Sequence, residues 1–228
     1  MLNAAWLSLK LAFFSATGAV VLGTLASLVM TRMRYFRSRT LFGALITAPL
    51  VMPEVILGLS LLLLFVSMGN ALNGLGIGQF QPKGVITLWI AHVTFTLAFV
   101  TVVISSRMSE LDKSLEEAAM DLGANRVKVF FQITLPIIAP ALVSGWLLAF
   151  TLSLDDVVIS SFVSGPGSTT LPIKVFSSVR LGLNPKINAL ATIMVSIVAL
   201  FAVIGWWWMR REERRRQRDM QLALQDNG

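Results

Sequence analysis

The chain has 228 residues, of which 55% are apolar and 14% are charged, and its mean hydropathy is +0.75. A water-soluble domain carries about 25% charged residues, so this composition excludes an ordinary soluble protein and indicates an integral membrane protein. The formal net charge of +7 does not indicate nucleic-acid binding, because the basic residues stand in short clusters at the ends of apolar runs. The chain has no cysteine, which excludes disulfides, thiolate nucleophiles and cysteine-ligated metals.

Five apolar stretches are long enough to cross a bilayer, which takes about 20 helical residues. They cover residues 4–30, 41–68, 84–106, 137–163 and 187–209. Glycine and proline interrupt several of them, which membrane helices tolerate when neighbouring helices satisfy the freed backbone groups. The predicted fold class is an all-α, polytopic membrane helix bundle. Residues 1–209 are expected to form one transmembrane domain, and residues 210–228 a basic tail.

Clusters of basic residues predict which loops face the cytoplasm. Residues 31–39 contain four arginines and no acid, and the tail after residue 209 is rich in arginine. Loops rich in Lys and Arg stay inside, so both clusters, the loop at residues 107–136 and the C-terminus are expected in the cytoplasm. The loop at residues 69–83 has one basic residue and is expected outside. This orientation places Met1 outside with no signal before it, so we expect one further N-terminal span.

A charged, helix-forming segment, residues 114–136, lies between the third and fourth spans. Ser114 and Glu117 have the spacing of a capping box, which predicts a helix start. Gly123 follows where a helix end favours a residue with positive φ. A second short helix is expected to start after Asn125 and to end before Pro136. The first half of the segment is acidic, which anionic lipid would repel, so a protein partner is favoured over an amphipathic hairpin on the lipid surface.

The spacing in this segment resembles the EAA motif of type I ABC importer permeases. The matching residues are Glu117, Ala118, Ala119, Gly123, Ile133, Leu135 and Pro136. Two other stretches, residues 48–65 and 148–182, are similar to the permeases of spermidine/putrescine importers, and the putrescine type is the most similar. Members of this family usually have six spans, which agrees with the expected further N-terminal span.

The resemblance implies that residues 107–136 form coupling helices that fit a cleft on an ATP-binding subunit. It also implies a dimer of such subunits in the cytoplasm, a second permease subunit and an external polyamine-binding protein, in the inner membrane of a bacterium. This chain is then a non-catalytic subunit without a cofactor, and the partner ATPase binds ATP and Mg. The sequence agrees, because it lacks the G-x-x-x-x-G-K-[ST] spacing of a phosphate-binding loop.

Three acids stand inside apolar runs that contain no Lys or Arg: Glu54, Asp155 and Asp156. A charge at mid-bilayer costs about 2.5–3.5 kcal/mol, so such residues normally face the bundle interior or an aqueous path. A path lined by carboxylates favours a cation such as a polyamine. Glu54 follows Pro49 and Pro53, so the alternative is that it lies at a helix kink near water and does not line the path. Neighbours on a helix point about 100° apart, so the alternative for one aspartate is to cap or bond a neighbouring helix.

Some other residues have structural interpretations, and other functions are alternatives to polyamine import. His92, the only histidine, is expected to be an interhelical hydrogen-bond partner rather than a proton relay. The three tryptophans Trp206–Trp208 are expected to anchor the last span at the membrane interface, where the basic tail contacts lipid. The alternative cargoes for the same machine are an opine, ferric iron or thiamine. A channel or proton-coupled carrier that works without ATP is the alternative of a different class.

Overall fold

The computed structural model describes residues 1–33, 37–76 and 80–180, together with scattered helical positions between residues 189 and 210. All regular structure in these residues is helical, which confirms the all-α prediction. The chain divides into two units, Met1–Lys174 and Val175–Gly228, and the sites described below lie in the first. The predicted span at residues 187–209 is described only at scattered positions. The tail beyond residue 210 and Arg34, Trp206 and Trp208 lie outside the described residues.

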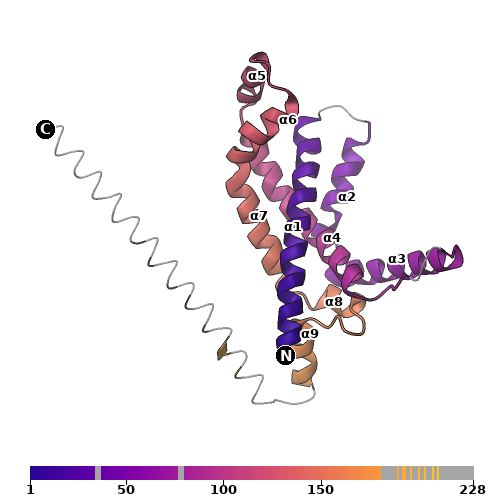
Figure 1. The fold of residues 1–228 in the computed structure, drawn as a ribbon. Coiled ribbons are helices and arrows are strands. Elements are labelled where there is room, and N and C mark those ends of the chain that lie inside the picture. The colour runs from indigo at the N-terminus through magenta and orange to yellow at the C-terminus, as the bar shows by residue number, and fades with distance from the viewer. Residues whose placement is uncertain are drawn as a thin grey trace. The chain divides into compact units, whose positions relative to one another are not determined.

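Three long helices form the main bundle of the first unit. They are α1 (Leu2–Arg32), α4 (Val85–Glu110) and α7 (Leu135–Asp155). Each of the three contacts the other two, and Figure 1 shows them side by side. Among the described residues, the helices long and apolar enough to cross a membrane are α1, α3 (Glu54–Gly74), α4 and the continuous helical segment Arg126–Asp155.

Small residues allow α1 and α4 to pack closely, as is usual between membrane helices. A Cβ atom on Gly23 of α1 would lie 2.9 Å from Cγ1 of Val100 on α4, so a larger residue would not fit without a shift. One turn later, Ser27 donates a hydrogen bond to the carbonyl of Thr101 (3.1 Å) and accepts one from Ser105 (3.0 Å). Close packing and hydrogen bonds therefore both fix α1 to α4 at residues 23–27.

The apolar stretch at residues 41–68 forms two helices rather than one span. Helix α2 (Arg39–Val51) ends before Met52 and Pro53, whose backbones are extended, and α3 begins at Glu54. Proline disfavours the helical conformation in the residue before it, which explains the break at Met52. Figure 1 shows α3 pointing away from the bundle of α1, α4 and α7.

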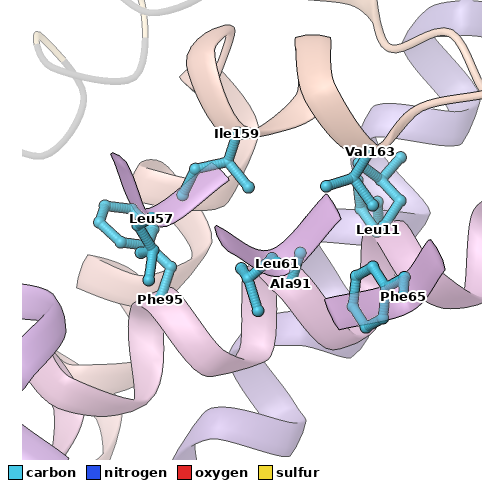
Figure 2. Close-up of a cluster of buried hydrophobic side chains, with 9 residues drawn as sticks. Leu11, Leu57, Leu61, Phe65, Ala91, Phe95, Ile159 and Val163 are labelled. Carbon is cyan, nitrogen blue, oxygen red and sulfur yellow. The ribbon is translucent and has the colours of Figure 1, made fainter. Parts of the chain in front are cut away.

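The apolar stretch at residues 137–163 is also broken. Helix α7 ends at Asp155, Asp156 is extended, and α8 (Val158–Val163) follows. A buried apolar cluster holds α8 and α3 against the bundle, and Figure 2 shows its side chains meeting. Its members come from α1, α3, α4 and α8: Leu11, Leu57, Leu61, Phe65, Leu88, Ala91, Phe95, Ile159 and Val163. The two helix breaks are thus brought to the same region of the molecule.

Candidate functional site

The charged segment begins with helix α5 (Lys113–Asp121). Its N-cap is Asp112, whose carboxylate accepts a hydrogen bond from the backbone N–H of Ser114 (3.0 Å). These bonds from Ser114 lower the pKa of the Asp112 carboxyl below its ordinary value. The prediction of a capping box headed by Ser114 is therefore wrong, because Asp112 stands earlier and its carboxylate already satisfies a free N–H of the first turn.

The end of α5 is closed around Gly123, as predicted. Gly123 has φ +87°, its N–H donates to the carbonyl of Met120 (2.9 Å), and Ala124 N–H donates to the carbonyl of Ala119 (3.1 Å). This pair of bonds is the Schellman motif. Helix α6 (Arg126–Val129) then begins, and the side chain of Asn125 caps it by accepting from Lys128 N–H (2.8 Å). The bend between the two helices thus depends on a residue without a side chain.

The second helix does not end before Pro136, so that prediction is wrong. A π-helical turn, η1 (Phe130–Thr134), connects α6 directly to α7. In this turn the N–H of Leu135 donates to the carbonyl of Phe130, five residues earlier. Proline lacks an N–H and clashes with the carbonyl four residues before it. The wider turn accommodates Pro136 without breaking the helix.

The predicted coupling residues lie at the surface of this segment. Glu117, Ala118, Gly123 and Pro136 are exposed, and Ala119, Ile133 and Leu135 are half-buried. Large apolar side chains are exposed beside them: Leu115, Leu122, Val127 and Phe131. Leu122 is 90% exposed. Contiguous exposed apolar side chains rimmed by polar residues are typical of an interaction surface. We call residues 113–131 the coupling surface.

A second candidate site lies at the two helix breaks and contains all three acids predicted from the sequence. A cavity of about 300 Å³ is lined by Glu54, Phe95, Leu152, Asp155, Asp156, Val157 and Val158. Glu54 is the first residue of α3 and Asp155 is the last of α7, and both side chains are exposed. Of the described residues that line this cavity, none is basic. The negative C-terminal end of α7 and the positive N-terminal ends of α3 and α8 all lie at this cavity and partly offset one another. The exposed carboxylates of Glu54 and Asp155 are therefore what makes the cavity favour a cation.

Asp156 has a different environment from Asp155. It is only 8% exposed, and its carboxylate accepts hydrogen bonds from the N–H groups of Ile159 (3.1 Å) and Ser160 (2.7 Å). It therefore caps the N-terminus of α8, which is the alternative that the sequence left open. The carboxylate also lies 3.5 Å from Nε2 of His92 on α4.

His92 connects three parts of the fold, as expected of an interhelical hydrogen-bond partner. Its Nδ1 lies 2.6 Å from the hydroxyl of Ser153 on α7, and its Nε2 lies 2.9 Å from the hydroxyl of Ser160 on α8. The ring is 1% exposed. The network of His92, Ser153, Asp156 and Ser160 holds the break between α7 and α8 in place and leaves Asp155 facing the cavity.

Comparison with known proteins identifies the family. Residues 19–218 match the family described as "Binding-protein-dependent transport system inner membrane component". The chain belongs to this family. It is 59% identical over 223 residues to the putrescine transport system permease protein PotI of Escherichia coli (strain K12), with 98% of this chain and 78% of that protein covered. It is 44% identical over 195 residues to the spermidine/putrescine transport system permease protein PotC of Haemophilus influenzae, with 86% of this chain and 71% of that protein covered.

Solved structures support the same fold. A chain of the MetNI methionine ABC transporter in an inward-facing conformation aligns with a TM-score of 0.69 at 16% identity, and 90% of this chain and 92% of that chain are covered. A chain of an amino acid ABC transporter aligns with a TM-score of 0.59 at 19% identity, with 92% of each chain covered. The resemblance to ABC importer permeases is thus confirmed, and the chain is a multi-pass protein of an inner-membrane family.

Proposed function

We propose that this chain is a permease subunit that moves a polyamine, putrescine or spermidine, into the cytoplasm by alternating access, driven by ATP. The observation that carries the choice of cargo is the acidic cavity between the two helix breaks. Carboxylates of Glu54 and Asp155 line it together with the C-terminal end of α7. Discontinuous membrane helices commonly form the substrate site of transporters. The ends of α3, α7 and α8 that meet here have opposite dipoles, so the preference for a cation rests on the two carboxylates. The names of the similar permeases support the same cargo.

The chemistry of a polyamine suits two separate carboxylates. Each of its amines is an ammonium ion at neutral pH and donates charge-assisted hydrogen bonds to a carboxylate. Glu54 and Asp155 belong to different helices, so they contact different parts of one extended cation or receive it in turn as the helices move. Asp156 acts on the pathway through α8, whose start it fixes. The apolar wall of Phe95 and Leu152 lies against the carbon chain.

The energy comes from partner subunits in this proposal. A dimer of cytoplasmic ATP-binding subunits binds ATP and Mg, so this chain needs no cofactor of its own and catalyses no reaction. The coupling surface, with Glu117, Ala118, Ala119 and Gly123, docks in a cleft on one of them. Ile133, Leu135 and Pro136 lie where the coupling surface continues into α7. A second permease subunit completes the pathway, an external polyamine-binding protein delivers the cargo, and the C-terminus faces the cytoplasm.

Uptake into membrane vesicles tests the proposal. The chain is expressed with its second permease, ATP-binding and binding-protein subunits, and uptake of radiolabelled putrescine is measured with and without ATP. We expect uptake that requires ATP and the binding protein and that excess unlabelled putrescine or spermidine inhibits. If thiamine, an opine or ferric iron inhibits uptake and no polyamine does, the proposal that the cargo is a polyamine is refuted. Equal uptake without ATP would refute the importer and favour a channel or carrier.

A further inference from the structure

The coupling helix α5 is not held in place by apolar packing. In the part of the chain that the structure describes, no residue of α5 is buried. A cavity of about 580 Å³ lies between the coupling surface and α1. Its walls include Leu25 and Leu28 of α1, Met120 of α5, and the polar side chains of Arg32, Glu116 and Thr134. A helix that transmits force must nevertheless be fixed to the elements that it moves. Some other contact must therefore hold α5.

That contact is a polar junction centred on Glu116. Oε1 of Glu116 accepts hydrogen bonds from Nη2 of Arg32 (2.8 Å), Nε of Arg32 (3.1 Å) and the hydroxyl of Thr134 (2.9 Å). Arg32 is the last residue of α1, and Thr134 is the last residue of the π-helical turn before α7. One carboxylate oxygen of α5 therefore contacts α1, 84 residues away in the sequence, and η1, 18 residues away.

The junction is sheltered from water, unlike most ion pairs at a surface. The side chains of Arg32 and Glu116 are 18% and 15% exposed, and Thr134 is 2% exposed. Salt screens such a pair less than an exposed one, and hydrogen bonds to charged groups are stronger than neutral ones. α1 in turn is fixed to α4 by the bonds of Ser27, little more than one turn before Arg32. Through Arg32 and then Ser27, α5 is therefore connected by hydrogen bonds to α1 and α4 of the main bundle.

We propose that Glu116 is a positioning residue that fixes the coupling helix to α1 through Arg32 and to the start of α7 through Thr134. A displacement of α5 then moves both helices together. This inference rests on the proposed docking of the coupling surface to an ATP-binding subunit. It differs from the docking itself, because Glu116 faces the bundle and not the exposed surface formed by Glu117 and Ala118.

Charge reversal in the complete transporter tests the role of the pair. Glu116→Arg and Arg32→Glu are made singly and together, and three quantities are measured: co-purified ATP-binding subunit, ATP hydrolysis, and uptake of radiolabelled putrescine. Each single variant is expected to retain the ATP-binding subunit but to transport about 5- to 30-fold less putrescine per ATP hydrolysed, the range that 1–2 kcal/mol produces. The double variant restores the attraction between the side chains at positions 32 and 116. We expect it to recover most of the wild-type amount of putrescine transported per ATP hydrolysed.

The chain offers a matched control. Arg107 and Glu110 form an ion pair (3.0 Å) near the last residue of α4, outside the coupling surface of residues 113–131, and both belong to one helix and are 49% and 63% exposed. Arg107→Glu is expected to leave putrescine transported per ATP unchanged. An equal loss in this variant would overturn the inference, because it would assign the effect to surface charge.

Milder variants keep the inference testable if a reversed charge prevents folding. Glu116→Gln keeps an acceptor oxygen for Thr134 and is expected to lose less coupling than Glu116→Ala. A wild-type ratio of transport to hydrolysis in Glu116→Ala would overturn the inference, and so would a double reversal no better than the worse single variant. Failure of the wild-type chain to co-purify with an ATP-binding subunit would instead refute the proposed function.

Discussion

The two adjacent aspartates provide a test that separates a pathway residue from a structural one. Asp155 is exposed to the acidic cavity, whereas Asp156 is 8% exposed and caps α8. Asp155→Asn leaves an oxygen to which an ammonium can still donate, but it removes the negative charge that attracts that ammonium. Two unit charges about 4 Å apart attract by about 1 kcal/mol in water and by more where water is partly excluded, so the loss is about 1–1.4 kcal/mol. This corresponds to a rise of about 5- to 10-fold in the half-saturating putrescine concentration.

The assay is the concentration dependence of ATP-driven uptake in vesicles. Glu54→Gln is expected to have a similar effect. If the two carboxylates act independently, the effects multiply, and the double variant should raise the half-saturating putrescine concentration roughly 25- to 100-fold. Asp156→Asn is the matched change one residue away. It weakens the cap of α8, so we expect less folded protein with an unchanged half-saturating concentration. A wild-type half-saturating concentration in the Glu54→Gln, Asp155→Asn double variant would refute the reasoning.

Three further predictions concern the coupling surface and the buried network. Gly123→Ala forces a side chain into φ +87° at a strain of about 1–2 kcal/mol, and we expect less co-purified ATP-binding subunit. Gly76→Ala is the control, since Gly76 has φ +68° and neither added Cβ would meet an atom within 4 Å. Because the folded-state pKa of Asp112 is lowered, its cap stabilises α5 fully above about pH 4, and this stabilisation is lost as the pH falls through the lowered pKa. Hydrogen-exchange protection factors of α5, which correct for the intrinsic pH dependence of exchange, should therefore fall on acidification in the wild type and not in Asp112→Asn. His92→Ala removes bonds to two serines worth about 0.6 kcal/mol each in a membrane, which should lower Tm in detergent, and an unchanged Tm would contradict the role given to this network.

Local sequence signals predicted the parts of the fold that local chemistry decides. Apolar length predicted helices, and the position of Gly123 predicted a positive φ at the end of α5, because a Schellman motif needs a residue without a Cβ there. Pro53 marked the break before α3 but was interpreted within one long span. Asp156 also carried a signal, because Asp favours helix N-termini and α8 begins two residues after it. The error at Ser114 arose because two residues with capping chemistry, Asp112 and Ser114, stand two positions apart.

Contacts between distant parts of the chain could not be predicted from one sequence. Arg32 and Glu116 are 84 residues apart, and each alone is an ordinary charged residue near a membrane span. The bonds of His92 to Ser153 and Ser160 likewise depend on how α4 meets the break after α7. Local periodicity carries no information about such pairs, because they form only when the bundle packs.

The two candidate sites are connected by a single helical segment. Arg126–Asp155 is continuous over 30 residues, from the coupling surface at one end to the acidic cavity at the other. At a rise of 1.5 Å per residue such a helix is about 45 Å long. Thr134 ties it to Glu116 near one end, and His92 ties it through Ser153 near the other. Under the proposed mechanism, a displacement of the coupling surface is therefore transmitted to Asp155 along one continuous helical segment. The π-helical turn at residues 130–134 lies where the coupling surface continues into α7, and a change of direction there displaces the far end of the helix the most.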